Sequence, residues 1–553
     1  MPNLLTYWHT VKYLKPIQLY GRIWFKLMRP HINLRPAPPL RLLKDCEWKT
    51  PACRNASLVA PTYFRFLSEI HKLTDRGWDD PSREKLWRYN LHYFDDLNAK
   101  HADMRSAWHR ALLLRWIQEN PAAVGTGWEP YPISLRIVNW IKWVLRGNSL
   151  PQECIQSLAV QTRWLAQRLE FHLLGNHLFA NAKALVFSGL FFKGSEARNW
   201  LGKGLNILKQ EVREQILPDG GHFERSTMYH SLALEDMLDL CNLTFTFADA
   251  VPSLWQPTII SWRRKTTLMN RWLSAMCHPD GEISFFNDAA VDIAPTPIEL
   301  AQYAARLGFH DQPTPVQNPT ILADSGYIRI DQKNIVLLLD VAPIGPNYLP
   351  AHAHADTLSF ELSLFGQRFL VNSGTSCYGN SSERLRQRGT KAHNTVAING
   401  IDSTEVWAGF RVARRAQPVD LEVVHKNGII MVCCSHDGYR RLPGRNIHHR
   451  KWLVHPSSLT IEDEITGSFH DAVAYFYLHP EVKICSKKIE AGELALQLPN
   501  GEKIDFSVKG GLLSINTTSW HPRFGVSEPN RCLSLKFCST FMKTEIKWHG
   551  SSL

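Results

Sequence analysis

Residues 351–362 read AHAHADTLSFEL, and this stretch decides how the second half of the chain folds. Side chains two apart on a strand share a face, so a strand here would point His352, His354 and Asp356 the same way. The same spacing continues into the apolar Leu358, which predicts a row facing the core. Two histidines in line with that row are expected to line a cleft or an interface.

The hydrophobic pattern changes near residue 315. Before it, apolar residues recur at three- and four-residue spacing, which predicts helices. They cover residues 106–118, 132–145, 153–174, 177–192, 197–216, 227–248 and 253–276. After it, short β-branched or apolar runs bounded by Gly, Asn, Asp or Pro predict strands. Runs of helices followed by runs of strands indicate separate α and β domains.

We therefore expect an α+β chain in three parts. Residues 1–60 form an arm that starts helical and ends irregular and rich in proline. Residues 61–314 form antiparallel helical hairpins, stacked in an array or closed into a ring. Residues 315–553 form a large antiparallel β-sandwich, with Pro313–Pro319 as the linker.

Composition limits the function classes. The net charge is +12, which favours a polyanionic partner such as nucleic acid, an anionic membrane surface or an acidic polysaccharide. A basic protein without such a partner is the alternative. No basic run or motif supports nucleic acid. Nineteen Trp residues either offer stacking planes for sugars or fill a helical core. Eleven scattered Cys residues without a CxxC pair indicate neither a disulfide framework nor a zinc knuckle.

The N-terminal segment shows no basic stretch followed by an apolar one, so no secretory signal is expected. The expected location is cytoplasmic, with a periplasmic or secreted location by another route left open. No run approaches the roughly 20 apolar residues of a membrane span. Ile17–Leu27, with Arg22 and Lys26, is predicted to be a surface helix, and a peripheral membrane contact is the alternative.

Two helix starts carry polar clusters. Residues 174–181 read LGNHLFAN, in which Gly175 ends one helix and Asn176 starts the next, where Asn is a common N-cap. His177 and Asn181, four residues apart, share a helix face.

The second cluster, PDGGHFERSTMYH at 218–230, leads through a Gly-Gly turn into a helix with Tyr229 near its start. The helix dipole and Arg225 would favour a phenolate there. The alternative is a tyrosine packed against the preceding loop.

A third helix start reads GWEPYPISLR at 127–136, and Pro132 suits the first turn of a helix. Trp128 and Arg136 would offer a stacking plane and a carboxylate clamp. They would equally suit a plain helix entry.

Polar residues also recur along the predicted strands. His354, Asn372 and His393 would reach one point from three strands, and imidazole and oxygen ligands suit Zn²⁺ or Mn²⁺. Asn brings no charge. A hydrogen-bonded polar seam between the sheets is the equal alternative.

Over about residues 80–400 the chain resembles the heparinase II/III superfamily of polysaccharide lyases. The motifs occur in the family's order: Trp128–Arg136, Asn176-His177, Asp219–Gly221 with Tyr229, His352–Asp356 and His393–Thr395. The resemblance implies an incomplete α/α toroid followed by an antiparallel β-sandwich, with the active cleft between them. It also implies β-elimination on an anionic uronic-acid polysaccharide or oligosaccharide. A basic, Trp-rich cleft would attract such a chain.

The resemblance also assigns roles. Asn176 and His177 neutralise the substrate carboxylate, with Arg136 helping. Tyr229 serves as acid, and as base when both reacting groups lie on one side. His352 is the base for the opposite epimer.

The candidate substrate contacts are Trp128, Arg136, Glu224 and Arg225. His354 and His393 resemble ligands of one structural divalent metal ion. The family usually has Asp where this chain has Asn372, which leaves a bound ion and a metal-free seam as open readings.

Two other functions remain open. A glycoside hydrolase on the same toroid would need a pair of carboxylates across the cleft, and Asp219 and Glu224 are the candidates. A protein that binds or assembles polysaccharide without cleaving it would not need Tyr229 or His352.

Overall fold

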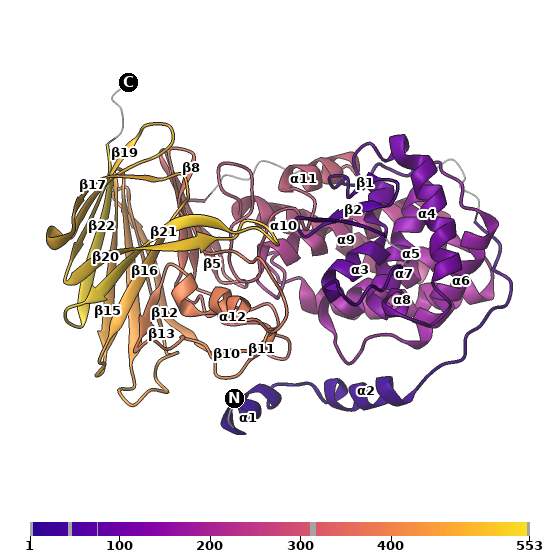
Figure 1. The fold of residues 1–553 in the computed structure, drawn as a ribbon, viewed down its shortest axis with the longest axis horizontal. Helices are drawn as coiled ribbons and strands as arrows, with labels where there is room; N and C mark the ends of the chain where they lie inside the picture. Colours follow the sequence, from indigo (N-terminus) through magenta and orange to yellow (C-terminus); the bar gives the residue numbers. More distant parts are fainter. Residues whose placement is uncertain (1–3, 42–46, 74–75, 310–316, 550–553) are drawn as a thin grey trace.

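The computed structural model describes residues 4–41, 47–73, 76–309 and 317–549. A helical body and a sheet body lie side by side (Figure 1). The predicted fold class is confirmed, because an incomplete α/α toroid precedes an antiparallel β-sandwich. The boundary expected after residue 314, and most of the linker expected at Pro313–Pro319, lie outside the described residues.

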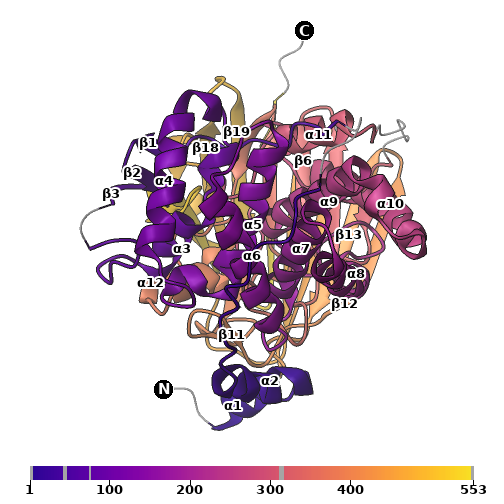
Figure 2. The same cartoon turned by 90° about the vertical axis from the view of Figure 1, so that its right-hand side faces the viewer.

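Two short helices, α1 (Leu4–Val11) and α2 (Pro16–Leu27), form an arm along one edge of the molecule in both views (Figures 1 and 2). The Phe25 ring packs on His172 of the helical body at 4.2 Å between centroids. The Tyr7 ring meets Trp407 beside the sheet body at 5.2 Å. The arm therefore bridges the two bodies.

The helical body follows the predicted periodicity closely. A small sheet precedes it, with strands β1 (Leu58–Ala60), β2 (Tyr63–Phe66) and β3 (Glu69–Lys72). Its helices are α3 (Lys85–Tyr93), α4 (Ser106–Glu119), α5 (Pro130–Leu145), α6 (Gln152–Gln167), α7 (Gly175–Phe191), α8 (Ser195–Gln215), α9 (Thr227–Thr246), α10 (Gln256–Ala275) and α11 (Pro297–Arg306). Each helix expected from the periodicity is present, but α6 ends seven residues before its expected end at 174.

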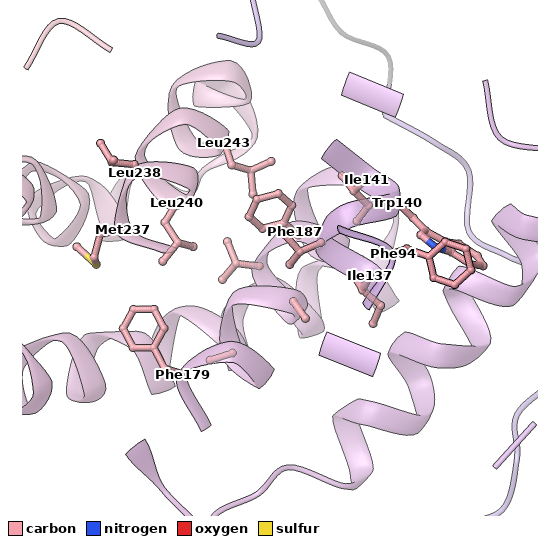
Figure 3. Packing of buried hydrophobic residues seen from close by; sticks show 14 of the residues in the cluster. Phe94, Ile137, Trp140, Ile141, Phe179, Phe187, Met237, Leu238, Leu240 and Leu243 are labelled. Carbon is pink, nitrogen blue, oxygen red and sulfur yellow. The ribbon is translucent and has the colours of Figure 1, made fainter. Parts of the chain in front are cut away.

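The core of this body forms where α5, α7 and α9 meet. Figure 3 shows Trp140, Phe187 and Leu240 among the side chains that fill it, and each is fully buried. Burying a large apolar side chain contributes about 1.5–3 kcal/mol. This packing holds the helix starts that carry the polar clusters.

The sheet body contains two large antiparallel sheets. One has the strand order β12-β13-β14-β15-β22-β19-β18-β17, and the other β20-β21-β16-β8-β7-β6-β5-β4 with β9 paired to β16. In β14, His448, Arg450, Trp452 and Val454 are buried at every second position, which is the pattern of a strand with one covered face.

The strand bounds are as follows. They are β4 (Thr320–Leu322), β5 (Tyr327–Gln332), β6 (Ile335–Asp340), β7 (Phe360–Leu364), β8 (Gln367–Leu370), β9 (Val396–Ile398), β10 (Val406–Trp407), β11 (Arg411–Val412), β12 (Pro418–Lys426), β13 (Ile429–His436), β14 (Ile447–His455), β15 (Ser458–Thr466), β16 (Ala472–Leu478), β17 (Lys483–Lys488), β18 (Glu493–Gln497), β19 (Lys503–Lys509), β20 (Gly511–Trp520), β21 (Glu528–Phe537) and β22 (Phe541–Trp548). One further helix, α12 (Ser382–Arg388), lies between β8 and β9.

The strand predicted across residues 351–356 is wrong, because β7 begins only at Phe360. The backbone of this loop bonds to another loop and to the end of α12 instead of a neighbouring strand: the His352 carbonyl accepts from Asp288 N, and Ala355 N donates to the Arg388 carbonyl. Leu358 has φ +62°, which interrupts the expected alternation, although its side chain is buried as predicted. The two histidines are thus positioned by loop contacts.

None of the helices in the described ranges is long and apolar enough to cross a bilayer. The ten cysteines within those ranges are unpaired.

Candidate active site

A cavity of about 830 Å³ lies where the helical body meets the sheet body. Residues of α1, α2, α3, α5, α7 and α9 line it, together with loops from the sheet body. Five of the candidate site residues line this cavity: Asn176, His177, Glu224, Tyr229 and His352. Six do not: Trp128, Arg136, Arg225, His354, Asn372 and His393.

Tyr229 and His352 lie side by side in the cavity wall. Their ring centroids are 3.9 Å apart, and the Tyr229 hydroxyl is hydrogen-bonded to the Tyr378 hydroxyl at 2.9 Å. Tyr229 stands in the first turn of α9, where the Ser226 hydroxyl caps the helix by accepting from the Tyr229 backbone N–H. A phenol from the helical body and an imidazole from the sheet body, both able to exchange protons, therefore meet in the cavity wall.

Asp288 fixes the orientation of His352. Its Oδ2 lies 2.9 Å from His352 Nδ1, its Oδ1 lies 2.8 Å from His354 Nε2, and Arg384 pairs with both oxygens. Burial raises the pKa of Asp288, but Arg384 and the histidine bonds outweigh it and hold that pKa well below its usual range. An ionised Asp288 accepts, so His352 Nδ1 donates, and in the neutral tautomer that this bond selects the lone pair is on Nε2.

Tyr229 remains a neutral phenol. Burial, followed by the nearby Tyr378, raises the pKa of Tyr229 well above its usual value. The expectation that Arg225 favours a phenolate is wrong, because the Arg225 Nε donates to the Ser325 carbonyl at 2.9 Å. Arg225 therefore joins the helical body to the β4–β5 region and makes no contact with the cavity, which also removes it from the substrate contacts.

Asn176 and His177 lie in the first turn of α7. Leu174 is the residue before the helix, so Asn176 is not the N-cap, and its side chain faces the cavity. His177 Nδ1 lies 3.2 Å from Glu170 Oε1. Burial lowers the pKa of His177, but the Glu170 carboxylate outweighs burial, so the net direction is upward. His177 is thus favoured as a cation next to a neutral amide.

Gly175 allows α7 to begin at this place. Its φ is +56°, and a Cβ there would lie 2.3 Å from Leu349 Cδ2. Leu349 belongs to the loop that leads to His352. The glycine therefore lets the helix start that carries Asn176 and His177 approach the loop that carries the imidazole.

Glu224 is buried in the cavity wall, 3.7 Å from His352 Nε2. Within the described part of the chain, neither of its carboxylate oxygens has a hydrogen-bond partner. Burial raises its pKa, and the nearby His352 and His177 only partly oppose this. Such a carboxyl group can exchange hydrogen bonds with sugar hydroxyls.

Trp128 and Arg136 belong to the core, so their prediction as substrate contacts is wrong. Arg136 is fully buried, and its guanidinium donates to Gln161 and to the carbonyls of His92 and Gly127. Trp128 is 5% exposed. Pro132 lies in the first turn of α5, as predicted, and the helix begins two residues earlier at Pro130. Other residues of α5 line the cavity, but neither Trp128 nor Arg136 does.

The cavity is neither strongly basic nor rich in tryptophan, contrary to expectation. Its lining has no Trp, and it has seven Lys or Arg against six Asp or Glu. Four of those cations are held in ion pairs: Arg54 with Glu235, Lys85 with Glu129, Lys142 with Asp239 and Lys183 with Asp236. The excess positive charge of the chain must therefore lie elsewhere.

The candidate metal ligands meet behind Asp288. His354 Nδ1 lies 3.3 Å from His393 Nε2, close to the separation of about 3.3 Å that two nitrogen ligands of a tetrahedral Zn²⁺ would have. The Asn372 amide oxygen, however, already accepts from Asn394 N at 3.2 Å. Within the described ranges, no three His, Cys, Asp or Glu side chains cluster to hold an ion. The residues supply two ligands and not a full set, so a metal ion stays a prediction.

Three residues important to this geometry were not predicted: Asp288, Tyr378 and Glu170. Asp288 follows the run ISFFN, which has no periodic or motif signal. Tyr378 lies in a Gly- and Ser-rich loop, and Glu170 lies inside the helix predicted over 153–174, four residues before its end. Asp288 and Tyr378 contact residues that are far away in the sequence. Glu170 contacts His177 across the turn that starts α7. Only the folded structure shows these contacts.

Comparison with known proteins gives a consistent result. Residues 78–305 match the family model "Heparinase II/III N-terminus", and residues 314–549 match "Heparinase II/III-like, C-terminal". A heparin-sulfate lyase of Bacteroides stercoris is 23% identical over 338 residues, covering 57% of this chain and 47% of the relative. Another, of Bacteroides thetaiotaomicron, is 26% identical over 360 residues, covering 57% and 50%.

The chain thus spans about half the length of the curated relatives it matches. Among solved structures, a crystal structure of heparinase III superposes with a TM-score of 0.69 at 17% identity, covering 97% of this chain and 90% of that one. At that identity the likeness establishes the fold.

Proposed function

The chain belongs to the heparinase II/III family, and on this premise we propose that it is a lyase that cleaves a uronic-acid-containing polysaccharide by β-elimination. The observation that supports this most is the Tyr229–His352 pair, 3.9 Å apart between ring centroids, in a cavity that also presents Asn176 and His177. The names of the relatives suggest a glycosaminoglycan-like substrate.

The first requirement of this reaction is to neutralise the uronate carboxylate. The C5 proton is weakly acidic while that carboxylate is ionised, because its removal builds up further negative charge. His177, whose pKa the Glu170 carboxylate raises, and the Asn176 amide would bind the carboxylate and stabilise the charge that develops.

The second requirement is a base for C5 and an acid for O4. The bond from Nδ1 to Asp288 selects the neutral tautomer of His352 with its lone pair on Nε2, and in that form Nε2 would take the C5 proton. The C5–H electrons form the C4–C5 double bond and the C4–O4 bond breaks. Tyr229, a neutral phenol, would protonate the departing O4. For a substrate with both groups on one side, Tyr229 would have to serve as base as well.

An ion between His354 and His393, if it binds, would hold the loop that carries His352 and supply no reacting group. His352 reaches the cavity through Asp288 and Arg384 without it. No step of the proposal depends on the ion.

The hydrolase alternative loses its predicted carboxylate pair. Asp219 accepts from the Ser325 backbone N–H at 2.7 Å and from its hydroxyl at 2.8 Å, and it does not line the cavity. Glu224 is left without the partner expected for it. The non-catalytic alternative leaves unexplained why the His352 imidazole and the Tyr229 phenol are held together in the cavity.

The test is a panel of uronic-acid polymers, sulfated and unsulfated, incubated with the purified protein with and without Zn²⁺ or Mn²⁺. The expected result is an increase in ultraviolet absorbance from the unsaturated uronic acid on at least one polymer. New reducing ends without that absorbance would establish a hydrolase. No new ends on any polymer would favour the binding protein.

A further inference from the structure

The outer face of the N-terminal arm is covered by large apolar side chains. In α2, Tyr20, Ile23, Trp24 and Leu27 fall at the spacing of one helix face, and Trp24 is 64% and Leu27 74% exposed. In α1, Leu4, Leu5, Trp8 and Val11 are likewise exposed. A surface helix of a globular protein normally turns such a face inward.

The inner face of the arm is already used for packing. Gln18 is buried and donates to the Tyr348 carbonyl, Gly21 and Phe25 pack against His172, and Lys15 pairs with Glu214. The arm is therefore anchored to the body in its present orientation. Its exposed apolar face is not explained by the fold of this chain.

The charge of this segment has one sign. Residues 1–44 hold eight Lys or Arg and no Asp or Glu, against a net charge of +12 for the whole chain. Lys12, Lys26 and Arg29 are exposed beside the apolar face. The positive charge that the cavity lacks is concentrated here.

We propose that the outer face of α1 and α2 binds the surface of an anionic phospholipid bilayer, with both helices lying in the interface. Apolar and aromatic residues flanked by Lys and Arg are the pattern of interfacial helices, which insert their apolar face among the lipid headgroups. The length of each helix suits lying on a bilayer, not crossing it.

The same observations disfavour other binding partners for the outer face of α1 and α2. A second copy of the chain would bring two segments of like charge together, which costs free energy. A polysaccharide would use the aromatic rings and the cations but not Leu4, Ile23 and Leu27. Aliphatic residues at this density need an apolar phase on the other side.

The arm also connects this surface to the cavity. Thr10, Leu14, Gln18 and Arg22 line the cavity from the opposite side of the helices. Binding would place the cavity wall about 10 Å, one helix diameter, from the lipid headgroups. The proposal does not depend on the reaction catalysed.

The test uses the full chain and sedimentation with vesicles. Vesicles containing phosphatidylglycerol are compared with vesicles of phosphatidylcholine alone. We expect binding to the anionic vesicles that weakens as salt rises. The double variant I23S/W24S should lower the partition coefficient at least about tenfold. K26E/R29E should lower it on anionic vesicles.

The matched controls are L254S and L512S, which remove leucines at least as exposed as Ile23 and Trp24 from the helical body and from β20. Both should bind vesicles like the unaltered protein, and all variants should keep its thermal transition. The proposal is overturned if the unaltered protein stays in solution with anionic vesicles, or if I23S/W24S binds as well as L254S. It is also overturned if the protein is a dimer that I23S/W24S dissociates while vesicle binding is absent.

Discussion

The two sides of the Asp288 carboxylate hold the same kind of side chain in different surroundings. On one side His352 has a 12% exposed side chain, packs on Tyr229 and lines the cavity. On the other side His354 is buried and faces His393. Burial lowers the pKa of His354 to about 4, despite its bond to Asp288, so it is neutral near pH 7.

The difference shows that surroundings, not residue type or spacing, separate the roles of two histidines that are two residues apart. The cavity side can exchange a proton with a bound molecule. The buried side can only support the loop, as a hydrogen-bonded seam or as part of an ion site. Substitutions on each side should therefore separate activity from stability.

The largest effect is expected from the cavity side. Replacing Tyr229 by Phe, or His352 by Gln, should lower kcat about 10³-fold, because each removes a proton-transfer group. The matched control is Y378F, which removes the hydroxyl bonded to Tyr229 and should cost far less. If Y229F and Y378F lose activity equally, Tyr229 has no special role.

Replacing Asp288 by Asn should affect both sides together. The pair with Arg384 breaks inside the protein, which should cost about 3–5 kcal/mol of unfolding free energy. The tautomer of His352 is no longer fixed, so kcat should fall at least about 10²-fold. Urea unfolding and kinetics measure the two effects. An active, stable D288N protein would contradict the role of Asp288 as the shared partner.

Replacing His354 by Gln should affect stability alone. One buried hydrogen bond to Asp288 changes, at a cost of about 1–3 kcal/mol, while His352 keeps its own bond to Oδ2. Calorimetry should show a lower Tm, and kcat should stay close to that of the unaltered protein. A loss of activity as large as that of H352Q would remove the distinction between the two sides.

The smallest expected effect is a shift in pH dependence. If protonated His177 binds the substrate carboxylate, kcat/KM should fall as the pH rises through the His177 pKa. The E170Q variant removes the carboxylate that raises this pKa, so the fall should move to lower pH. The control is E282Q, at a carboxylate outside the cavity lining. An unchanged alkaline limb in E170Q would show that another group controls it.

The fold could be predicted because its signals are local. The pattern of apolar residues predicts helices before residue 315 and strands after it. The structure has helices in the first part and mainly strands in the second. The strand predicted at 351–356 was wrong because its signal was only local. Alternating side chains indicate a strand only when a neighbouring strand provides partners for the backbone hydrogen bonds. Here Asp288 and Arg388 provide the backbone partners.

The site was only partly predictable. Asn176, His177, Tyr229 and His352 were identified through ordered motifs, and the structure brings them to one cavity. Asp288 could not be found, because its partners lie 64 to 96 residues away in the chain. The prediction that Arg136 contacts substrate was wrong, because a sequence does not reveal whether a guanidinium binds substrate or buried backbone carbonyls.

The most direct test of the lyase proposal is mass spectrometry of the products from a defined uronic-acid oligosaccharide that the protein cleaves. The account predicts that the two fragments together have the mass of the substrate, with one fragment unsaturated, and that Y229F forms neither. Fragments that together exceed the substrate by one water, with no unsaturation, would contradict it.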